Sequence, residues 1–274
     1  MKKTLIALVV VASAASGAAN AWSTGDFTGS FDINGEITSS QYNDKWEWKS
    51  GEALSFQNTN QDMSDGNKVL TITQTTPAPI LLGRTKEAFS APAVGVGAIP
   101  LISFSDYEGN TVQLQSSGGQ NKGFLNLPMK DAEGRKLGDV KINVTTAGVL
   151  SRNDSDFVKI ISVVSGDDSA IYNGGLVSSV VASGQSASAL VRKFGNDGHS
   201  ELLQKVVAAA PEAAKKSQQS WAVATKVNMV NSNVMASSYS LGIDQGQTIE
   251  ATFTNPVTTT TQWSAPLNVA VTYN

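Results

Sequence analysis

Apolar and polar residues alternate along several short stretches of the chain, and this period of two residues predicts β-strands. In the first stretch, Phe27, Phe31, Ile33 and Ile37 share one face with two glycines, and polar residues occupy the other face. Turn-forming residues separate the stretches that follow. We expect the next strands at Trp46–Trp48, 70–73, 99–104, 111–115, 140–146 and 249–254. Many short strands with turns between them predict an all-β chain folded as a β-sandwich.

The longest alternation lies at the end of the sequence. Every second residue is apolar from Trp263 to Tyr273, through Ala265, Leu267, Val269 and Val271. We therefore expect one unbroken strand over 263–273. Pro266 lacks an N–H group, which predicts that this strand is at the edge of a sheet or carries a bulge. An amphipathic strand near each end of a chain leaves edges that another strand must cover.

Between about residues 150 and 238 the spacing changes to that of a helix. Apolar residues three and four positions apart, Leu202, Leu203, Val206, Val207 and Ala210, fall on one helical face. We expect Asp197 or Ser200 to cap the start of this helix. Pro211 is expected to end the helix or to begin a new one, because proline is tolerated at the first helical position. The pattern predicts a small α-helical insertion in an all-β chain.

The composition restricts the chemistry. The chain has 274 residues, no Cys and a single His, which excludes disulfides, thiolate nucleophiles and Cys/His zinc sites. Lys2-Lys3, the apolar residues 5–15 and Ala19-Asn20-Ala21 together predict a signal peptide over 1–21, and hence export. Of the 20 basic residues, Lys2 and Lys3 leave with this peptide, so 18 remain against 23 acidic ones, a net charge of −5. This charge disfavours nucleic-acid binding.

The segment 22–38 has two readings on pattern alone. If it folds back onto its own sheet, the chain is an ordinary closed sandwich. If it leaves the body, it completes the sheet of the next molecule by strand addition, and Phe27, Phe31, Ile33 and Ile37 fill pockets in the recipient. Because donor and acceptor surfaces differ, the second arrangement builds a head-to-tail filament. The alternation itself does not decide between the two.

Several longer segments of the sequence help to choose between these two arrangements of residues 22–38. They are Lys45–Lys49, Pro79–Phe89, Ser105–Gly109, Leu127–Lys130, Gly246–Phe253 and Gln262–Ala270. Together they resemble the FaeG-type major fimbrial subunits of the enterobacterial chaperone–usher pathway. The likeness covers roughly residues 1–150 and 239–274, and it is weak over 151–238.

The resemblance implies an incomplete immunoglobulin-like β-sandwich over 39–274, with the insertion at about 150–238 and with segment 22–38 as a donor strand. The implied partners are copies of the chain itself, a periplasmic chaperone and an outer-membrane usher. The chain would thus be exported through the periplasm to a fimbria on the cell surface. In such subunits the C-terminal strand pairs with the chaperone and has a penultimate aromatic residue, as Tyr273 is here. We therefore expect Leu267, Val269, Val271 and Tyr273 along that edge.

The resemblance also implies that the major subunit is the adhesin, with its receptor surface in the helical insertion. A host glycoconjugate is then the expected receptor, although the sequence departs from the family in this region. Trp221 either stacks on a sugar ring or packs in the core. Asn196, Asp197 and His199 are the polar candidates for glycan binding. No nucleophile is positioned beside His199, so we expect no catalytic residue, no metal site and no cofactor.

Two other functions share some of these features. An outer-membrane β-barrel would share the signal peptide and the alternating C-terminal strand, but aromatic residues make up only 7% and the sequence shows no repeated strands with aromatic girdles. A secreted carbohydrate-active enzyme would need paired carboxylates, which the sequence does not identify. We expect a fimbrial subunit that assembles by donor-strand exchange and binds host glycans, not an enzyme.

Overall fold

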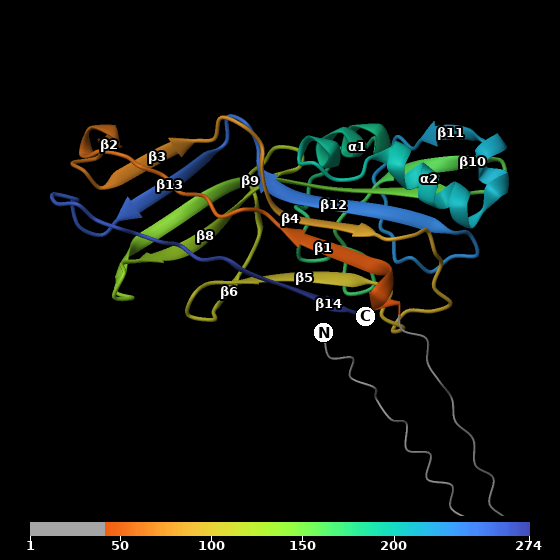
Figure 1. Ribbon diagram of the computed structural model, residues 1–274, viewed down its shortest axis with the longest axis horizontal. Coiled ribbons are helices and arrows are strands. Elements are labelled where there is room, and N and C mark those ends of the chain that lie inside the picture. Colours follow the sequence, from red (N-terminus) through yellow and green to blue (C-terminus); the bar gives the residue numbers. More distant parts are fainter. Residues whose placement is uncertain (1–41) are drawn as a thin grey trace, which may run out of the picture. The chain divides into compact units, whose positions relative to one another are not determined.

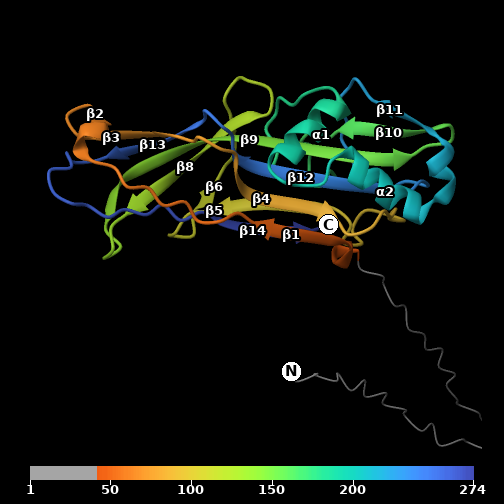
Figure 2. The ribbon, with the colours of Figure 1, turned by 45° about the horizontal axis from the view of Figure 1, so that its top comes forward.

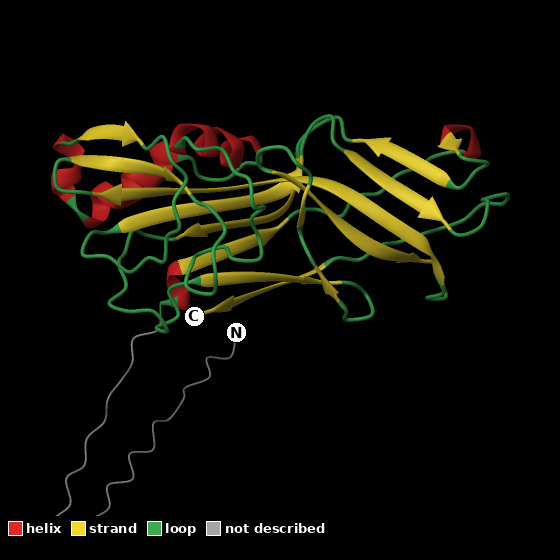
Figure 3. Ribbon diagram, turned by 180° about the vertical axis from the view of Figure 1, so that it is seen from behind, coloured by secondary structure: helices red, strands yellow, loops and turns green. Residues whose placement is uncertain are grey.

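The computed structural model describes residues 42–274, which form a mainly β structure with two short α-helices (Figure 1, Figure 3). The strands are β1 (Trp46–Ser50), β2 (Met63–Ser64), β3 (Val69–Thr73), β4 (Ala78–Thr85), β5 (Pro100–Ser105), β6 (Thr111–Val112), β7 (Gln115–Ser116), β8 (Lys122–Lys130), β9 (Lys136–Asn153), β10 (Phe157–Ser162), β11 (Ser217–Ser220), β12 (Met235–Ile243), β13 (Thr248–Phe253) and β14 (Asn268–Tyr273). The helices are α1 (Gly184–Lys193) and α2 (His199–Ala209), with short 3₁₀ helices η1 (Asn43–Lys45), η2 (Asn60–Asp62) and η3 (Pro211–Lys215). The predicted signal peptide and donor strand, with Phe27, Phe31, Ile33 and Ile37, lie outside the described residues.

Strand β9 organises the larger sheet. It is 18 residues long, and its two halves have different neighbours. The first half pairs antiparallel with β8 and β13, and the second half with β12 and β10. The sheet continues from β12 to β4 and β1, from β13 to β3 and β2, and from β10 to the parallel strand β11. Every other part of the larger sheet is therefore held in place through β9.

A second sheet, with the strand order β14-β5-β6, covers one face of the larger sheet. In Figure 1 it lies below β1 and β4, whereas the helices lie above β9 and β12. The main core between the two sheets includes Trp46, Leu81, Phe104, Tyr239 and Leu241, all buried. The all-β character predicted from the alternation is thus confirmed.

The helices cover the opposite face and form a second, smaller core. Ala187 and Val191 of α1 and Leu202 and Val206 of α2 pack with Val149 of β9. The strands beneath the helices are therefore buried on both faces. All nine residues of β12 are buried, including five small or polar residues. A strand of this kind shows no alternation, which is why the sequence pattern missed β12.

The structure confirms the predicted helix as α2 but not its cap. The N-cap is Gly198, not Asp197 or Ser200. The backbone N–H of Gly198 donates to the Glu201 carboxylate (2.9 Å), and the N–H of His199 donates to Ser188 Oγ (2.9 Å). A side chain of α1 therefore satisfies a free N–H at the start of α2, which local sequence cannot reveal. Pro211 begins η3, as expected, and α1 was not predicted.

The unbroken strand predicted over 263–273 is wrong. Only β14, Asn268–Tyr273, is a strand, and it pairs antiparallel with β5. Upstream, Ser264 exchanges both backbone hydrogen bonds with Lys130 (2.9 Å each) as an isolated bridge. Pro266 lies between the bridge and β14 and cannot donate a ladder hydrogen bond. The apolar alternation continues through this break, although the strand does not.

A close contact between β1 and β4 depends on a glycine. The Trp48 ring lies directly over Gly83, where an added Cβ would overlap the ring. The same ring packs edge-on against Tyr172, with centroids 6.3 Å apart, and contacts Tyr239. Gly83 thus sets how deeply the Trp48 indole enters the sandwich.

We predict that Gly83→Ala destabilises the fold by about 1–3 kcal/mol, because the methyl group forces the Trp48 ring out of its packed position. The free energy of unfolding from denaturant titration measures this effect. Gly119→Ala is the control, since its methyl group meets only the flexible side chain of Lys122. Equal stability of the two variants would show that the Trp48 ring moves at no cost.

Candidate functional site

Two of the strands with a single partner strand, β1 and β14, lie next to each other at the margins of the two sheets. β1 pairs with β4 and ends the larger sheet, and β14 pairs with β5 and ends the smaller one. Both lie at the lower margin of the view in Figure 2. We call β1 and β14 the open edges, because among residues 42–274 no strand pairs with their other sides.

The pairing of β14 determines which backbone groups face the open side. In an antiparallel pair, successive residues direct their N–H and C=O groups alternately toward the partner and away from it. Asn274 and Ile99 exchange both backbone hydrogen bonds (3.0 and 3.1 Å), so the even-numbered residues of β14 face β5. Val269, Val271 and Tyr273 therefore present their N–H and C=O groups to the open side.

The same reasoning applies to β1. The N–H of Gly51 donates to the Ile80 carbonyl (3.0 Å), which assigns the odd-numbered residues to β4. Trp46, Trp48 and Ser50 therefore face the open side with their backbone groups. The two open edges together present a set of donors and acceptors arranged for further strand pairing.

Apolar side chains that are only partly buried lie along β14 and the segment before it. Seven of them, all at odd-numbered positions, pack against the main core. We call them the apolar row: Val257, Trp263, Ala265, Leu267, Val269, Val271 and Tyr273. The residues between them along β14 are exposed. Leaving apolar surface in water costs about 25 cal/mol per Å² relative to burying it. A strand added at β14 would bury this row.

A hydrogen bond connects the two open edges. The Trp48 indole Nε1–H donates to the Tyr273 hydroxyl (2.8 Å). Burial raises the pKa of Tyr273, so its hydroxyl stays protonated at neutral pH. Tyr273 thus belongs to the apolar row through its ring and to the β1 edge through its hydroxyl.

The sequence located part of this site. Leu267, Val269, Val271 and Tyr273, expected along the C-terminal edge, all lie in the apolar row. Their roles toward a chaperone or a donor strand stay predictions. Nothing in the sequence indicated that Trp48 hydrogen-bonds to Tyr273, beyond the place of Trp48 on one face of a predicted strand. Val257 was also missed, because it follows an Asn-Pro turn and belongs to no predicted strand.

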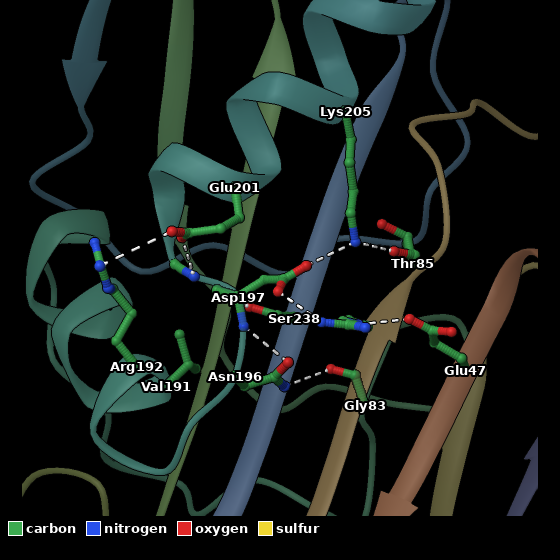
Figure 4. Close-up of polar contacts among 12 residues, drawn as sticks. Glu47, Gly83, Thr85, Val191, Arg192, Asn196, Asp197, Glu201, Lys205 and Ser238 are labelled. Atoms are coloured by element: carbon green, nitrogen blue, oxygen red, sulfur yellow. Dashed lines mark hydrogen bonds and ion pairs between the residues drawn. The ribbon is translucent and has the colours of Figure 1, made fainter.

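Two of the residues expected to bind glycan fasten the helices to the sheet (Figure 4). The Asn196 side-chain amide donates to the Gly83 and Tyr239 carbonyls (2.9 and 2.7 Å). The Asp197 carboxylate accepts from Arg84 and Lys205 (2.7 Å each). These contacts hold the connection between α1 and α2 against β4 and β12.

Arg84 extends this network to an open edge. Its guanidinium donates to Glu47 of β1 as well as to Asp197. The hydrogen bond that Arg84 donates to Glu47 and the charge of Asp197 raise the pKa of Arg84 despite partial burial. A chain of charged contacts therefore runs from β1 through β4 to the helical insertion.

His199 is the first residue of α2 rather than part of a free loop. Its ring Nδ1 lies 3.1 Å from Ser188 Oγ, the same oxygen that accepts the His199 backbone N–H. The residue is partly buried. Its contacts join the two helices.

Trp221 lies apart from these three residues, beside β10. The residue is 37% exposed, and the Lys159 Nζ lies 3.8 Å from the centroid of its ring. Lys159 also pairs with Asp154 (2.8 Å). Burial opposes ionisation of Asp154, but hydrogen bonds from Arg152 and Lys159 outweigh it and lower the pKa of this carboxyl. The glycan-binding role of Trp221, Asn196, Asp197 and His199 stays a prediction.

Two further kinds of feature are lacking in residues 42–274. No group of three or more His, Asp or Glu side chains in this range is placed to hold a metal ion. No helix in the same range has the length and apolar character needed to cross a membrane.

Known proteins match the chain over its whole length. A family model described as "Fimbrial, major and minor subunit" matches residues 1–274. K88 fimbrial protein AB and K88 fimbrial protein AC of Escherichia coli are each 46% identical to the chain, over 284 and 282 residues, with 100% of each sequence covered. The F41 fimbrial protein of Escherichia coli is 26% identical over 286 residues, also with 100% of each sequence covered. These matches confirm the resemblance to FaeG-type subunits, and the chain belongs to the K88 family of fimbrial subunits.

Proposed function

We propose that this fimbrial subunit polymerises by donor-strand exchange, with segment 22–38 of one copy pairing with the open edges of the next. The observation that supports the proposal is the uncovered pair of edges, β1 and β14, with the apolar row beside them. A strand added there gains main-chain hydrogen bonds from both edges and buries the row. The resulting body is an immunoglobulin-like sandwich that its own residues 42–274 leave incomplete.

Segment 22–38 suits these edges in length and pattern. It has the same number of residues as the stretch 257–273 that contains the apolar row. Phe27, Phe31, Ile33 and Ile37 share one strand face, as the members of the row do. A donor strand of this pattern places apolar side chains toward the row and polar side chains toward solvent.

The same edges suit the assembly partners of a chaperone–usher system. Before polymerisation, an apolar row beside unpaired backbone groups favours aggregation. A periplasmic chaperone that lends a strand to β14 prevents this, and an outer-membrane usher then exchanges the chaperone for the next subunit. Export through the periplasm to the cell surface completes the route.

We also propose that the subunit is an adhesin and that its helical insertion binds host glycans. Trp221 supports this, because the residue is partly exposed and the Lys159 ammonium against its ring is a hydrogen-bond donor for a sugar hydroxyl. Aromatic rings of this kind stack on the apolar face of sugars. Exposed glutamines and serines of β11 immediately precede Trp221.

We predict that residues 39–274 become more stable when residues 22–38 are fused after Asn274. Each of the four large apolar side chains of the donor contributes about 1.5–3 kcal/mol when buried. We expect a rise in melting temperature of at least about 10 °C and higher solubility. Equal melting temperature and solubility with and without the fused segment would contradict strand donation.

The two faces of β14 offer a matched pair of substitutions. We predict that Val271→Asp slows polymerisation at least about tenfold, because a carboxylate would be buried under the donor strand. Thr272→Asp, on the exposed face of the same strand, should leave the rate close to that of the unsubstituted chain. Fibre length in electron micrographs and sedimentation of polymer measure the rates. Equal slowing by both would mean that added charge, not burial in the row, is responsible.

Glycan binding is tested on the fused monomer with a glycan array. We predict that Trp221→Ala lowers binding about tenfold, while Trp221→Phe retains most of it, because a ring still stacks on the sugar. Val223→Ala, at a position that is 59% exposed and two residues away, is the control. Unchanged binding by Trp221→Ala would exclude this ring from the receptor site.

A further inference from the structure

An exposed loop without charge lies beside the point where the described chain begins. Residues 90–98, between β4 and β5, contain no charged residue, and Val94 at the tip is 44% exposed. Gly95 and Gly97 on either side of Val96 have φ values of +86° and +81°, a conformation that favours glycine. These glycines turn the loop so that Val94 points outward while Val96 packs against the main core.

The loop is fixed to the root of the N-terminal segment. The N–H of Tyr42 donates to the Val96 carbonyl (3.0 Å), and the Tyr42 ring stacks on Phe89 with centroids 5.7 Å apart. Asn274 bonds to Ile99, just after the loop. Tyr42, Val94 and Asn274 therefore lie near the C-terminal end of β14, which we call the root end; Figure 1 shows the C-terminus beside η1.

The chain between the donor strand and the body is short. Only residues 39–41 separate Thr38, the end of the proposed donor strand, from Tyr42. Fully extended, this stretch spans at most about 14 Å. We infer that the loop carrying Val94 is a second contact between subunits, which packs against the body of the copy that receives the donor strand. This inference rests on the proposed donor-strand exchange.

The geometry of a filament selects the opposing surface. If Thr38 entered the recipient beside Tyr273, the two bodies would meet through the root end of each, and such a contact closes into a pair. A filament instead places Thr38 at the Val257 end of the apolar row. The segment that carries the apolar row is itself uncharged, since residues 251–274 contain no Asp, Glu, Lys or Arg. The uncharged loop of one copy therefore packs against the uncharged segment of the next, and Val94 is buried in this contact.

The absence of cysteine allows a direct test. The full mature chain carrying Val94→Cys is assembled into fibres as a minor fraction together with the unsubstituted chain. The rate at which maleimide labels the cysteine in these fibres is measured. It is then divided by the labelling rate of the same variant in denaturant, which corrects for the reactivity of the thiol itself. Val223→Cys is the matched control, a valine that is 59% exposed and lies in the insertion. We expect labelling at position 94 to be at least about tenfold slower than at position 223 after this correction.

Equal corrected rates at the two positions in well-formed fibres would overturn the second contact and leave donor-strand exchange intact. If the unsubstituted chain forms no fibres, or if fibres persist after residues 22–38 are removed, the proposed function fails and the second contact fails with it. Slow labelling at position 94 alone supports the contact. The two proposals are thus distinguished by whether fibres form and by where they protect the thiol.

Discussion

Backbone hydrogen-bond satisfaction at the strand edges is the constraint on which the rest of this structure depends. β9 gives the larger sheet paired strands on both sides, but β1 and β14 each satisfy only half of their backbone groups within residues 42–274. The apolar row beside β14 adds an incompletely buried surface. Both deficits have the same remedy, a strand that pairs with the edges and covers the row. A fimbrial subunit that uses its neighbour for this purpose couples the folding of each copy to the growth of the fibre.

The helical insertion contacts the strands of the larger sheet from the face opposite the main core. Asn196 and Asp197 bind the α1–α2 connection to β4 and β12, and Arg84 carries the contact on to Glu47 of β1. The proposed receptor surface therefore rests on the same sheet that presents an open edge. This arrangement explains why polar residues that resemble a binding site in sequence have structural partners in the fold.

The sequence predicted several elements whose two faces differ. β3, β5, β13 and α2 each have a more buried and a more exposed face, so their apolar spacing is visible along the chain. Among the elements missed, β4, β8 and β10 carry apolar residues on both faces, and β12 is buried on both faces. Helix α1 was missed as well, and its cap, Ser183, lies within a serine- and glycine-rich stretch.

At the candidate site, the alternation identified Val269, Val271 and Tyr273 because each is a side chain on one face of a strand. It could not identify the Trp48–Tyr273 hydrogen bond, whose partners are 225 positions apart in sequence. Nor could it identify the bridge between Ser264 and Lys130, after which no strand pairing occurs until β14 begins at Asn268. The residue pattern shows which side chains share one face of a strand or helix. It does not show which segments the topology brings into contact.

Amide hydrogen exchange at the open edge of β14 tests the central claim most directly. We expect the amides of Val269, Val271 and Tyr273 to exchange rapidly in the unassembled full-length monomer and to become strongly protected in fibres, while those of β12 are protected in both states. Protection of the three amides in the monomer, equal to that in fibres, would mean that the chain covers its own edge. That result would contradict donation between copies.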